Sequence, residues 1–298
     1  MAADKGNALF SKKSMNQLLL IFSFIGFSFA VYDESFARNK ALPLSAAAYS
    51  DVPENCLANR FVNTQIKGKY RVNCDEFKGD SCFSFTAINH ADKAIILSFR
   101  GSAGFMQLVS EGVDSIFTKK TVSPIGGDVS EYFYNAYQKL WDAGMKNDFL
   151  TLKNANPTYD VWITGHSLGG AMATVAASNI VKYGYVSTNK LKLYTFGQPR
   201  TGDKTYAVAH DALIPESYRL THSRDMVPHI PPENLLSYFH HKNEVWYNND
   251  MTIGSKHVEC DADESKNCSD GLIIKLSIQD HLHYFNTDIS SYGVSGCH

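Results

Sequence analysis

The sequence lacks any block rich in lysine and arginine, and its charges nearly cancel, with 28 Lys+Arg against 30 Asp+Glu in 298 residues. A chain without a basic patch has no electrostatic means of capturing nucleic acid. The contents of proline and glycine are modest, at 9 and 20 residues, while hydrophobic residues make up 44% of the chain. This composition excludes a disordered or collagen-like chain and indicates a globular protein. No internal repeat and no low-complexity linker interrupts it, which favours a single domain.

An apolar run near the N-terminus, residues 18–31, is too short for a comfortable bilayer span, which needs about 20 residues. Two lysines precede the run, and small residues, Ser28 and Ala30, stand where a signal peptidase inspects the chain. We therefore predict that residues 1–30 are a secretory signal peptide and that residues 31–298 form the mature domain. The alternatives are an uncleaved signal anchor or a buried core helix.

The six cysteines contain no C-x₂-C pair, so a zinc site is a weak interpretation. Secretion would place them in an oxidising compartment, where an even count suits three disulfides, although six cysteines allow 15 pairings. Cys56 and Cys297 stand near the two ends of the mature chain, and a bridge between them would tie the termini together. The other four form two pairs, each eight residues apart in polar sequence, for which local bridges are economical: Cys74 with Cys82, and Cys260 with Cys268.

Short apolar or β-prone runs alternate with helical patterns along the chain. A helical period covers residues 129–150, and a small-residue-rich helix follows Gly169 and ends at Gly184. Strands alternating with helices predict an α/β fold on a mostly parallel central sheet flanked by helices. The predicted strands are 93–101, 159–164, 191–196, 217–222 and 271–278.

A G-x-S-x-G motif at Gly165–Gly169 carries the chemistry of the sequence. The bare motif is weakly specific, but here it lies between a predicted strand and a predicted helix, where a nucleophile elbow must lie. The tight turn would leave no room for side chains at Gly165 and Gly169, and it would lift Ser167 above the N-terminus of a helix. The alternative is an ordinary glycine-rich strand–helix turn.

A serine hydroxyl needs a base and an orienting acid to become a nucleophile, and in this arrangement the chain order is Ser, then Asp or Glu, then His. Asp225, in the polar loop after the strand 217–222, is the natural acid, with Asp203 as the runner-up. The base should follow the last predicted strand, where His281 and His283 both qualify. A metal site at this His-x-His pair lacks a supporting carboxylate pattern.

Five motifs in order make the chain resemble the class 3 lipase family, the fungal-type triacylglycerol lipases, from about Ala46 to the C-terminus. They read LSFRGS (97–102), ITGHSLGGA (163–171), FGQPRTG (196–202), RLTHSRDMVP (219–228) and HLHYF (281–285). The resemblance implies an α/β-hydrolase fold, places the base at His281, and implies a disulfide that links the termini, matching Cys56 with Cys297. The chain departs from the family at Val129-Ser130-Glu131-Tyr132-Phe133, where members often show V-H-x-G-F; this puts the acyl-binding groove in doubt.

The mechanism that follows is acyl transfer through an acyl-enzyme. His281 takes the proton of Ser167, Asp225 orients the imidazole, and Ser102 with the backbone N–H of Leu168 binds the oxyanion. No metal and no organic cofactor is needed.

An amphipathic helix pattern over residues 105–117 directly follows Ser102. On pattern alone it would be a core helix, but the resemblance implies a lid. The residues that its opening would expose are Phe105, Met106, Leu108 and Val109.

The function expected is therefore that of a secreted, extracellular serine hydrolase that cleaves carboxylic ester bonds of acylglycerol lipids at a lipid–water interface, with no stable protein partner implied. A phospholipase or a soluble-ester esterase of feruloyl type on the same scaffold is one alternative. A non-catalytic, lipase-like lipid-binding protein is another, against which the intact set of Ser167, Asp225, His281 and Ser102 argues.

Overall fold

The computed structural model describes Met1 and residues 31–74, 81–101, 114–233 and 235–298. Its centre is an eight-stranded sheet in the order β1-β2-β3-β6-β7-β9-β11-β12. The five central strands from β3 to β11 run parallel, and β1, β2 and β12 are antiparallel to their neighbours. The strand bounds are β1 Thr64–Val72, β2 Cys82–Asn89, β3 Ala94–Arg100, β6 Asp160–His166, β7 Leu191–Phe196, β9 Ser217–His222, β11 Glu244–Tyr247 and β12 Val258–Cys260. The predicted α/β fold with a mostly parallel sheet is confirmed.

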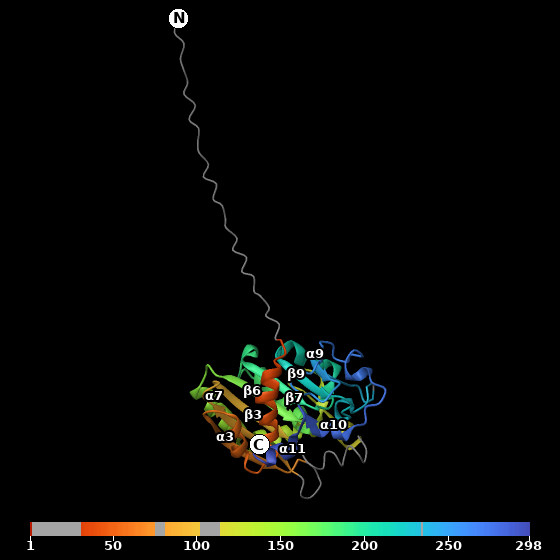
Figure 1. Cartoon of the computed structure of the whole chain (residues 1–298). Coiled ribbons are helices and arrows are strands. Elements are labelled where there is room, and N and C mark those ends of the chain that lie inside the picture. The colour runs from red at the N-terminus through yellow and green to blue at the C-terminus, as the bar shows by residue number, and fades with distance from the viewer. Residues whose placement is uncertain (2–30, 75–80, 102–113, 234) are drawn as a thin grey trace.

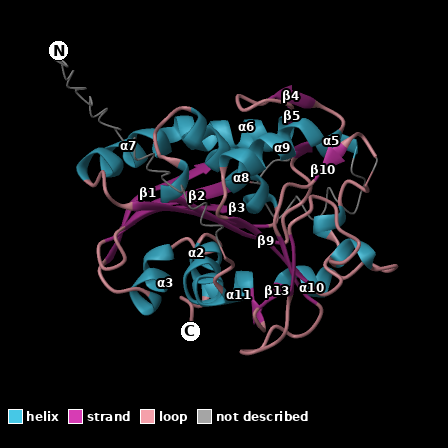
Figure 2. Cartoon of the chain, turned by 90° about the horizontal axis from the view of Figure 1, so that it is seen from above, coloured by secondary structure: helices cyan, strands magenta, loops and turns pink. Residues whose placement is uncertain are grey.

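Helices cover both faces of this sheet (Figure 2). One layer holds α6 (Glu131–Leu140), α7 (Lys146–Ala155), α8 (Leu168–Lys182) and α9 (Lys204–Leu213). The other holds α2 (Leu42–Ala47), α3 (Pro53–Arg60) and α11 (Ile289–Val294), preceded along the chain by α1 (Glu34–Phe36). Because both faces are covered, β3 and β6 are almost wholly buried, as expected for parallel strands between two layers of helices. Two hydrophobic clusters result, one on each face of the sheet.

Smaller elements surround the carboxyl edge of the parallel strands. A four-stranded sheet pairs β10 (Tyr238–Phe239), β8 (Gly202–Asp203), β5 (Asp128–Ser130) and β4 (Lys120–Val122). A hairpin pairs β13 (His283–Tyr284) with β14 (Thr287–Asp288), and the short helices α5 (Asp114–Phe117) and α10 (Ile278–Leu282) complete the described elements used below. None of the helices in the described residues is long and apolar enough to cross a membrane.

Two expectations about elements need correction. The helical period over 129–150 is divided between α6 and α7, because the connecting residues Trp141–Met145 contain a kink at Gly144, whose φ of 123° is not helical. The strand predicted over residues 271–278 is wrong: its only ladder contact is a single bridge between Ser277 and Asp225, and Ile278 begins α10. The aliphatic side chains of that segment are exposed rather than buried, so they do not stabilise a strand.

The three disulfides join the cysteines in the pairs predicted, Cys56–Cys297, Cys74–Cys82 and Cys260–Cys268. The bridge of Cys56 spans 241 residues and fastens the C-terminus to α3, and Figure 1 shows the C-terminus between α3 and α11. In the chain-entropy model, a bridge this long destabilises the unfolded chain by about 5.5 kcal/mol.

Candidate active site

Ser167 lies in the sharp turn between the end of β6 and the start of α8. Its backbone has φ 60° and ψ −131°, a conformation that non-glycine residues rarely adopt outside strained functional turns. A Cβ at Gly165 would lie 2.3 Å from the carbonyl oxygen of Gly169, and a Cβ at Gly169 would lie 2.2 Å from that of Phe99. Glycine is therefore required on both sides of the serine, as the sequence predicts for a nucleophile elbow.

Three side chains from distant parts of the chain meet at this turn. The Oγ of Ser167 lies 2.9 Å from Nε2 of His281, and Nδ1 of His281 lies 3.0 Å from both carboxylate oxygens of Asp225. The elbow supplies the serine, α10 supplies the histidine, and the loop after β9 supplies the aspartate. This is the connected arrangement of nucleophile, base and orienting acid that acyl transfer needs.

Asp225 is fully buried and has four hydrogen-bond contacts. Besides the contacts of both its oxygens with Nδ1 of His281, its Oδ2 accepts from the Tyr284 hydroxyl at 2.5 Å and its Oδ1 accepts from the Val227 N–H at 2.8 Å. Burial raises the pKa of Asp225, but the attraction of His281 and these hydrogen bonds outweigh burial and hold the pKa below its usual value. The carboxylate is therefore ionised, and Nδ1 of His281 carries the proton that it accepts.

A second imidazole, that of His166, stacks on the ring of His281. His166 lies with its ring centroid 4.5 Å from that of His281, and its Nε2 is 2.8 Å from the His281 carbonyl oxygen. Burial, with the neighbouring His281, lowers the pKa of His166 to about 3, so the ring is neutral. Since the carbonyl can only accept, Nε2 carries the single proton, and Nδ1 accepts from the Tyr49 hydroxyl at 2.7 Å. Tyr49 and His166 thus hold the backbone of the histidine whose side chain faces Ser167.

The structure separates the other candidates from this site. Asp203 caps α9 by accepting from the Tyr206 N–H at 2.8 Å, and His283 contacts Gln279 through its Nδ1. Leu168, the first residue of α8, is buried beside Ser167 and contributes one of the N–H groups that begin the helix. The remaining predicted site residues, Ser102 and the lid residues Phe105, Met106, Leu108 and Val109, lie outside the described residues.

The position at which the family motif is missing has a structural role of its own. Ser130 lies where the resemblance leads us to expect His, and its Oγ donates to the Ile116 carbonyl oxygen at 2.8 Å. The Ser130 Oγ also accepts from the Phe133 N–H, which caps α6. Ser130 therefore ties α6 to α5.

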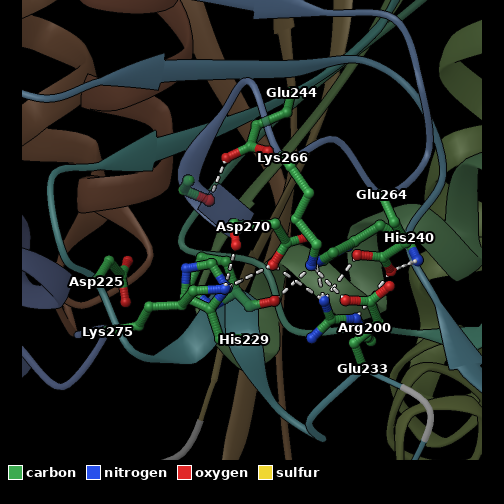
Figure 3. A network of polar contacts seen from close by, with 12 residues as sticks. Arg200, Asp225, His229, Glu233, His240, Glu244, Glu264, Lys266, Asp270 and Lys275 are labelled. Carbon is green, nitrogen blue, oxygen red and sulfur yellow. Dashed lines mark hydrogen bonds and ion pairs between the residues drawn. The ribbon is translucent and has the colours of Figure 1, made fainter. Parts of the chain in front are cut away.

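A buried polar network supports the loop that carries Asp225 (Figure 3). The guanidinium of Arg200 binds Glu264 through two nitrogens, at 2.9 and 2.7 Å, and donates to the Pro231 carbonyl oxygen at 2.9 Å. Asp270 contacts the same guanidinium at 3.3 Å and accepts from Nδ1 of His229 at 3.0 Å. Burial opposes its ionisation, but these partners hold the pKa of Asp270 far below its usual value. The network fastens residues 260–270 to the chain on either side of His229.

Tyr49, His166 and Tyr284 are the site residues whose roles the sequence did not reveal. His166 and Tyr284 lie inside recognised motifs, at the second position of G-x-S-x-G and in HLHYF, which is a signal that could have found them. Tyr49 is 117 residues from His166 and carries no local signal. No group of three or more His, Cys, Asp or Glu side chains within the described ranges could hold a metal ion.

The fold and the joined Ser, His and Asp side chains define an α/β hydrolase. A profile of class 3 lipases matches residues 96–235. The chain is 33% identical to a Caenorhabditis elegans lipase over 93% of this chain and 86% of that protein. It is 34% identical to a secreted mono- and diacylglycerol lipase of Fusarium solani over 68% of this chain, which covers 60% of that longer protein. The crystal structure of a Rhizopus microsporus var. chinensis lipase superposes with a TM-score of 0.74 at 26% identity, covering 94% of this chain and 99% of that one. The chain belongs to the class 3 lipase family.

Proposed function

We propose that this protein is a secreted lipase that hydrolyses carboxylic ester bonds of acylglycerols through an acyl-enzyme. The observation that supports this most directly is the continuous contact from Ser167 through His281 to Asp225. His281 accepts the Ser167 proton as Oγ attacks the ester carbonyl, and returns it to the departing alcohol. Asp225 stabilises the imidazolium that forms between these steps. Water, activated by the same histidine, then releases the fatty acid and regenerates the serine.

The oxyanion of each tetrahedral intermediate requires donors that are in place before the reaction. We assign this role to the backbone N–H of Leu168, at the positive end of α8, and to Ser102. Loss of one such donor costs about 2.7–4 kcal/mol of transition-state stabilisation. We also propose that Phe105, Met106, Leu108 and Val109 form the apolar face of a lid, so that activity rises when substrate exceeds its solubility limit.

Secretion is the second part of the proposal. The three disulfides favour an oxidising compartment, and the Fusarium relative is described as secreted. Residues 1–30 would then be removed as a signal peptide. The N-terminal sequence of protein collected from the culture medium tests this directly, and a start at Val31 is expected.

The experiment that tests the proposed reaction compares the purified chain with Ser167→Ala. The unchanged chain should hydrolyse emulsified triolein, diolein and monoolein and should be labelled by a fluorophosphonate probe. Ser167→Ala should lose both properties while keeping its circular dichroism spectrum and melting temperature, because the variant removes only the nucleophile. Hydrolysis retained by the pure variant would refute the assignment. Phosphatidylcholine and methyl ferulate, assayed side by side, test the phospholipase and esterase alternatives.

A further inference from the structure

One asparagine of the chain lies in a sequence that the secretory pathway can modify. Asn267-Cys268-Ser269 is the only Asn-x-Ser/Thr triplet in the sequence whose middle residue is not proline. The other triplet, Asn156-Pro157-Thr158, contains the proline that prevents modification. Because such a triplet often occurs by chance, the surroundings of Asn267 in the fold decide whether an oligosaccharide can be attached and accommodated there.

The Asn267 side chain lies where the fold has room for a bulky group. It is exposed, and within the described residues its side-chain amide makes no hydrogen bond, although its backbone N–H does. The loop that carries it is closed by the Cys260–Cys268 disulfide. An ion pair of 2.5 Å between Lys266 and Glu233, both labelled in Figure 3, fastens the loop to the molecule. An oligosaccharide on Asn267 would therefore extend into solvent without displacing a contact.

The other end of the triplet is inaccessible in the folded chain. Ser269 is 1% exposed, and its hydroxyl donates to the Glu244 carboxylate at 2.5 Å. Cys268, between the two, is also 1% exposed and is bonded to Cys260. A transferase that reads the asparagine and the hydroxyl together cannot engage this triplet in the native fold. Modification therefore has to come before Ser269 packs against β11 and before the disulfide closes.

We propose that Asn267 carries an N-linked oligosaccharide, attached in the secretory pathway before the Cys260–Cys268 loop folds. This inference rests on the secretion part of the proposed function, because the transfer takes place only on chains that enter that pathway. In the reaction, the amide nitrogen of Asn267 bonds to C1 of the first sugar of a polyprenyl-diphosphate-linked oligosaccharide. The bond between C1 and the diphosphate oxygen breaks, the polyprenyl diphosphate leaves, and the amide nitrogen gives one of its two protons to a base of the transferase.

The test detects the oligosaccharide by mass, independently of any ester hydrolysis. The full chain secreted from eukaryotic cells should lose mass on treatment with peptide N-glycosidase F, and its peptide should then contain aspartate at position 267. Asn267→Gln should remove the glycosidase-sensitive mass. The matched control Asn154→Gln, at an exposed asparagine outside any such triplet, should retain it. A secreted chain without an oligosaccharide on Asn267 would overturn the proposal.

A second form of the protein separates this proposal from that of secretion. The full chain is expressed with a cleavable secretory leader added before Met1, so that it enters the pathway whatever residues 1–30 do. An oligosaccharide on Asn267 in this form but not in the natural chain would refute the proposed secretion and support the site. Its absence from both forms would overturn the site.

The order of events is tested with purified oligosaccharyltransferase and the full chain made without oligosaccharide in bacteria. The reduced, unfolded chain should accept the oligosaccharide at Asn267. The oxidised, folded chain should not accept it, because Cys268 and Ser269 are buried there. Equal modification of the two forms would contradict attachment before folding.

Discussion

Tyr284 is a buried phenol whose hydroxyl donates to the carboxylate of Asp225 at 2.5 Å and accepts from the His222 N–H at 3.3 Å. Burial and the adjacent Asp225 charge raise the pKa of Tyr284 well above its usual value. The phenol therefore stays protonated, and donates its hydrogen bond to Asp225, throughout the working range of pH. A charge-assisted hydrogen bond of this kind contributes about 1.5–3 kcal/mol. Tyr284 therefore acts on catalysis through Asp225, as a positioning residue.

Tyr284→Phe should raise the pKa of Asp225, because the anion loses one of its donors. The acidic limb of the kcat/KM profile for a soluble ester should then move to higher pH, with kcat falling more than KM changes. The control is Tyr247→Phe, which removes another buried phenol hydroxyl, bonded at 3.0 Å to that of Tyr32 and not to the triad. A pH profile shifted equally in both variants would show that the effect is only structural.

The network around Arg200 joins three elements that the chain order keeps apart: the loop after β7, the loop after β9, and the segment closed by Cys260–Cys268. Arg200 is 1% exposed, and Glu264 and Asp270 are 5% exposed at their side chains. Removing one partner of such a buried group leaves charges without compensation, which costs more than the intact network contributes.

Arg200→Met should lower the free energy of unfolding by about 3–5 kcal/mol, since Glu264 loses its buried cation and Asp270 keeps only Lys275. Arg200→Lys should lose less, because it keeps the charge but not the planar fork that binds Glu264 twice. Urea denaturation measures both values, and hydrogen exchange should show faster opening of residues 260–277 in the Met variant. Equal stability of all three proteins would contradict this role.

Prediction from sequence succeeded for elements whose composition and environment agree. β7 and β9 have the predicted bounds, because their apolar runs are buried in the sheet and end in polar loops. Residues 271–278 are richer in aliphatic residues than either strand, yet they do not form a strand and expose most of these side chains. The hydrophobicity of an apolar segment does not determine whether that segment pairs with a neighbouring strand. The candidate triad could be predicted from the sequence because its members lie in motifs. Tyr49 carries no such signal, because only the tertiary fold brings it to His166.

At the scale of the whole molecule, the core contains an unusual set of neutral histidines. His210 bridges Ser178 and Ser217 with its two ring nitrogens, at 3.1 and 3.0 Å, and its ring centroid lies 4.0 Å from that of His241. Burial lowers the pKa of His210 to about 3, with the Arg219 charge adding to the effect. The pKa values of His240 and His241 are likewise well below the usual value, chiefly because of burial.

These histidines make the fold sensitive to acid. Between pH 6.5 and about 3 an unfolded chain carries a proton on His210 that the folded chain does not, so the contribution of His210 to stability is complete above pH 6.5 and falls by about 1.4 kcal/mol per pH unit below it. The low pKa values of His240 and His241 act in the same direction. Asp211 has the opposite effect on stability, and offsets the contribution of one histidine. Burial and Asp263 raise its pKa to about 7, so as pH falls the folded chain binds a proton there before the unfolded chain does. His210→Gln should therefore reduce the slope of unfolding free energy against pH by about 1.4 kcal/mol per unit between pH 6 and 4. Urea denaturation at each pH measures this, with the exposed His90→Gln as control, and an unchanged slope in His210→Gln would contradict the assignment.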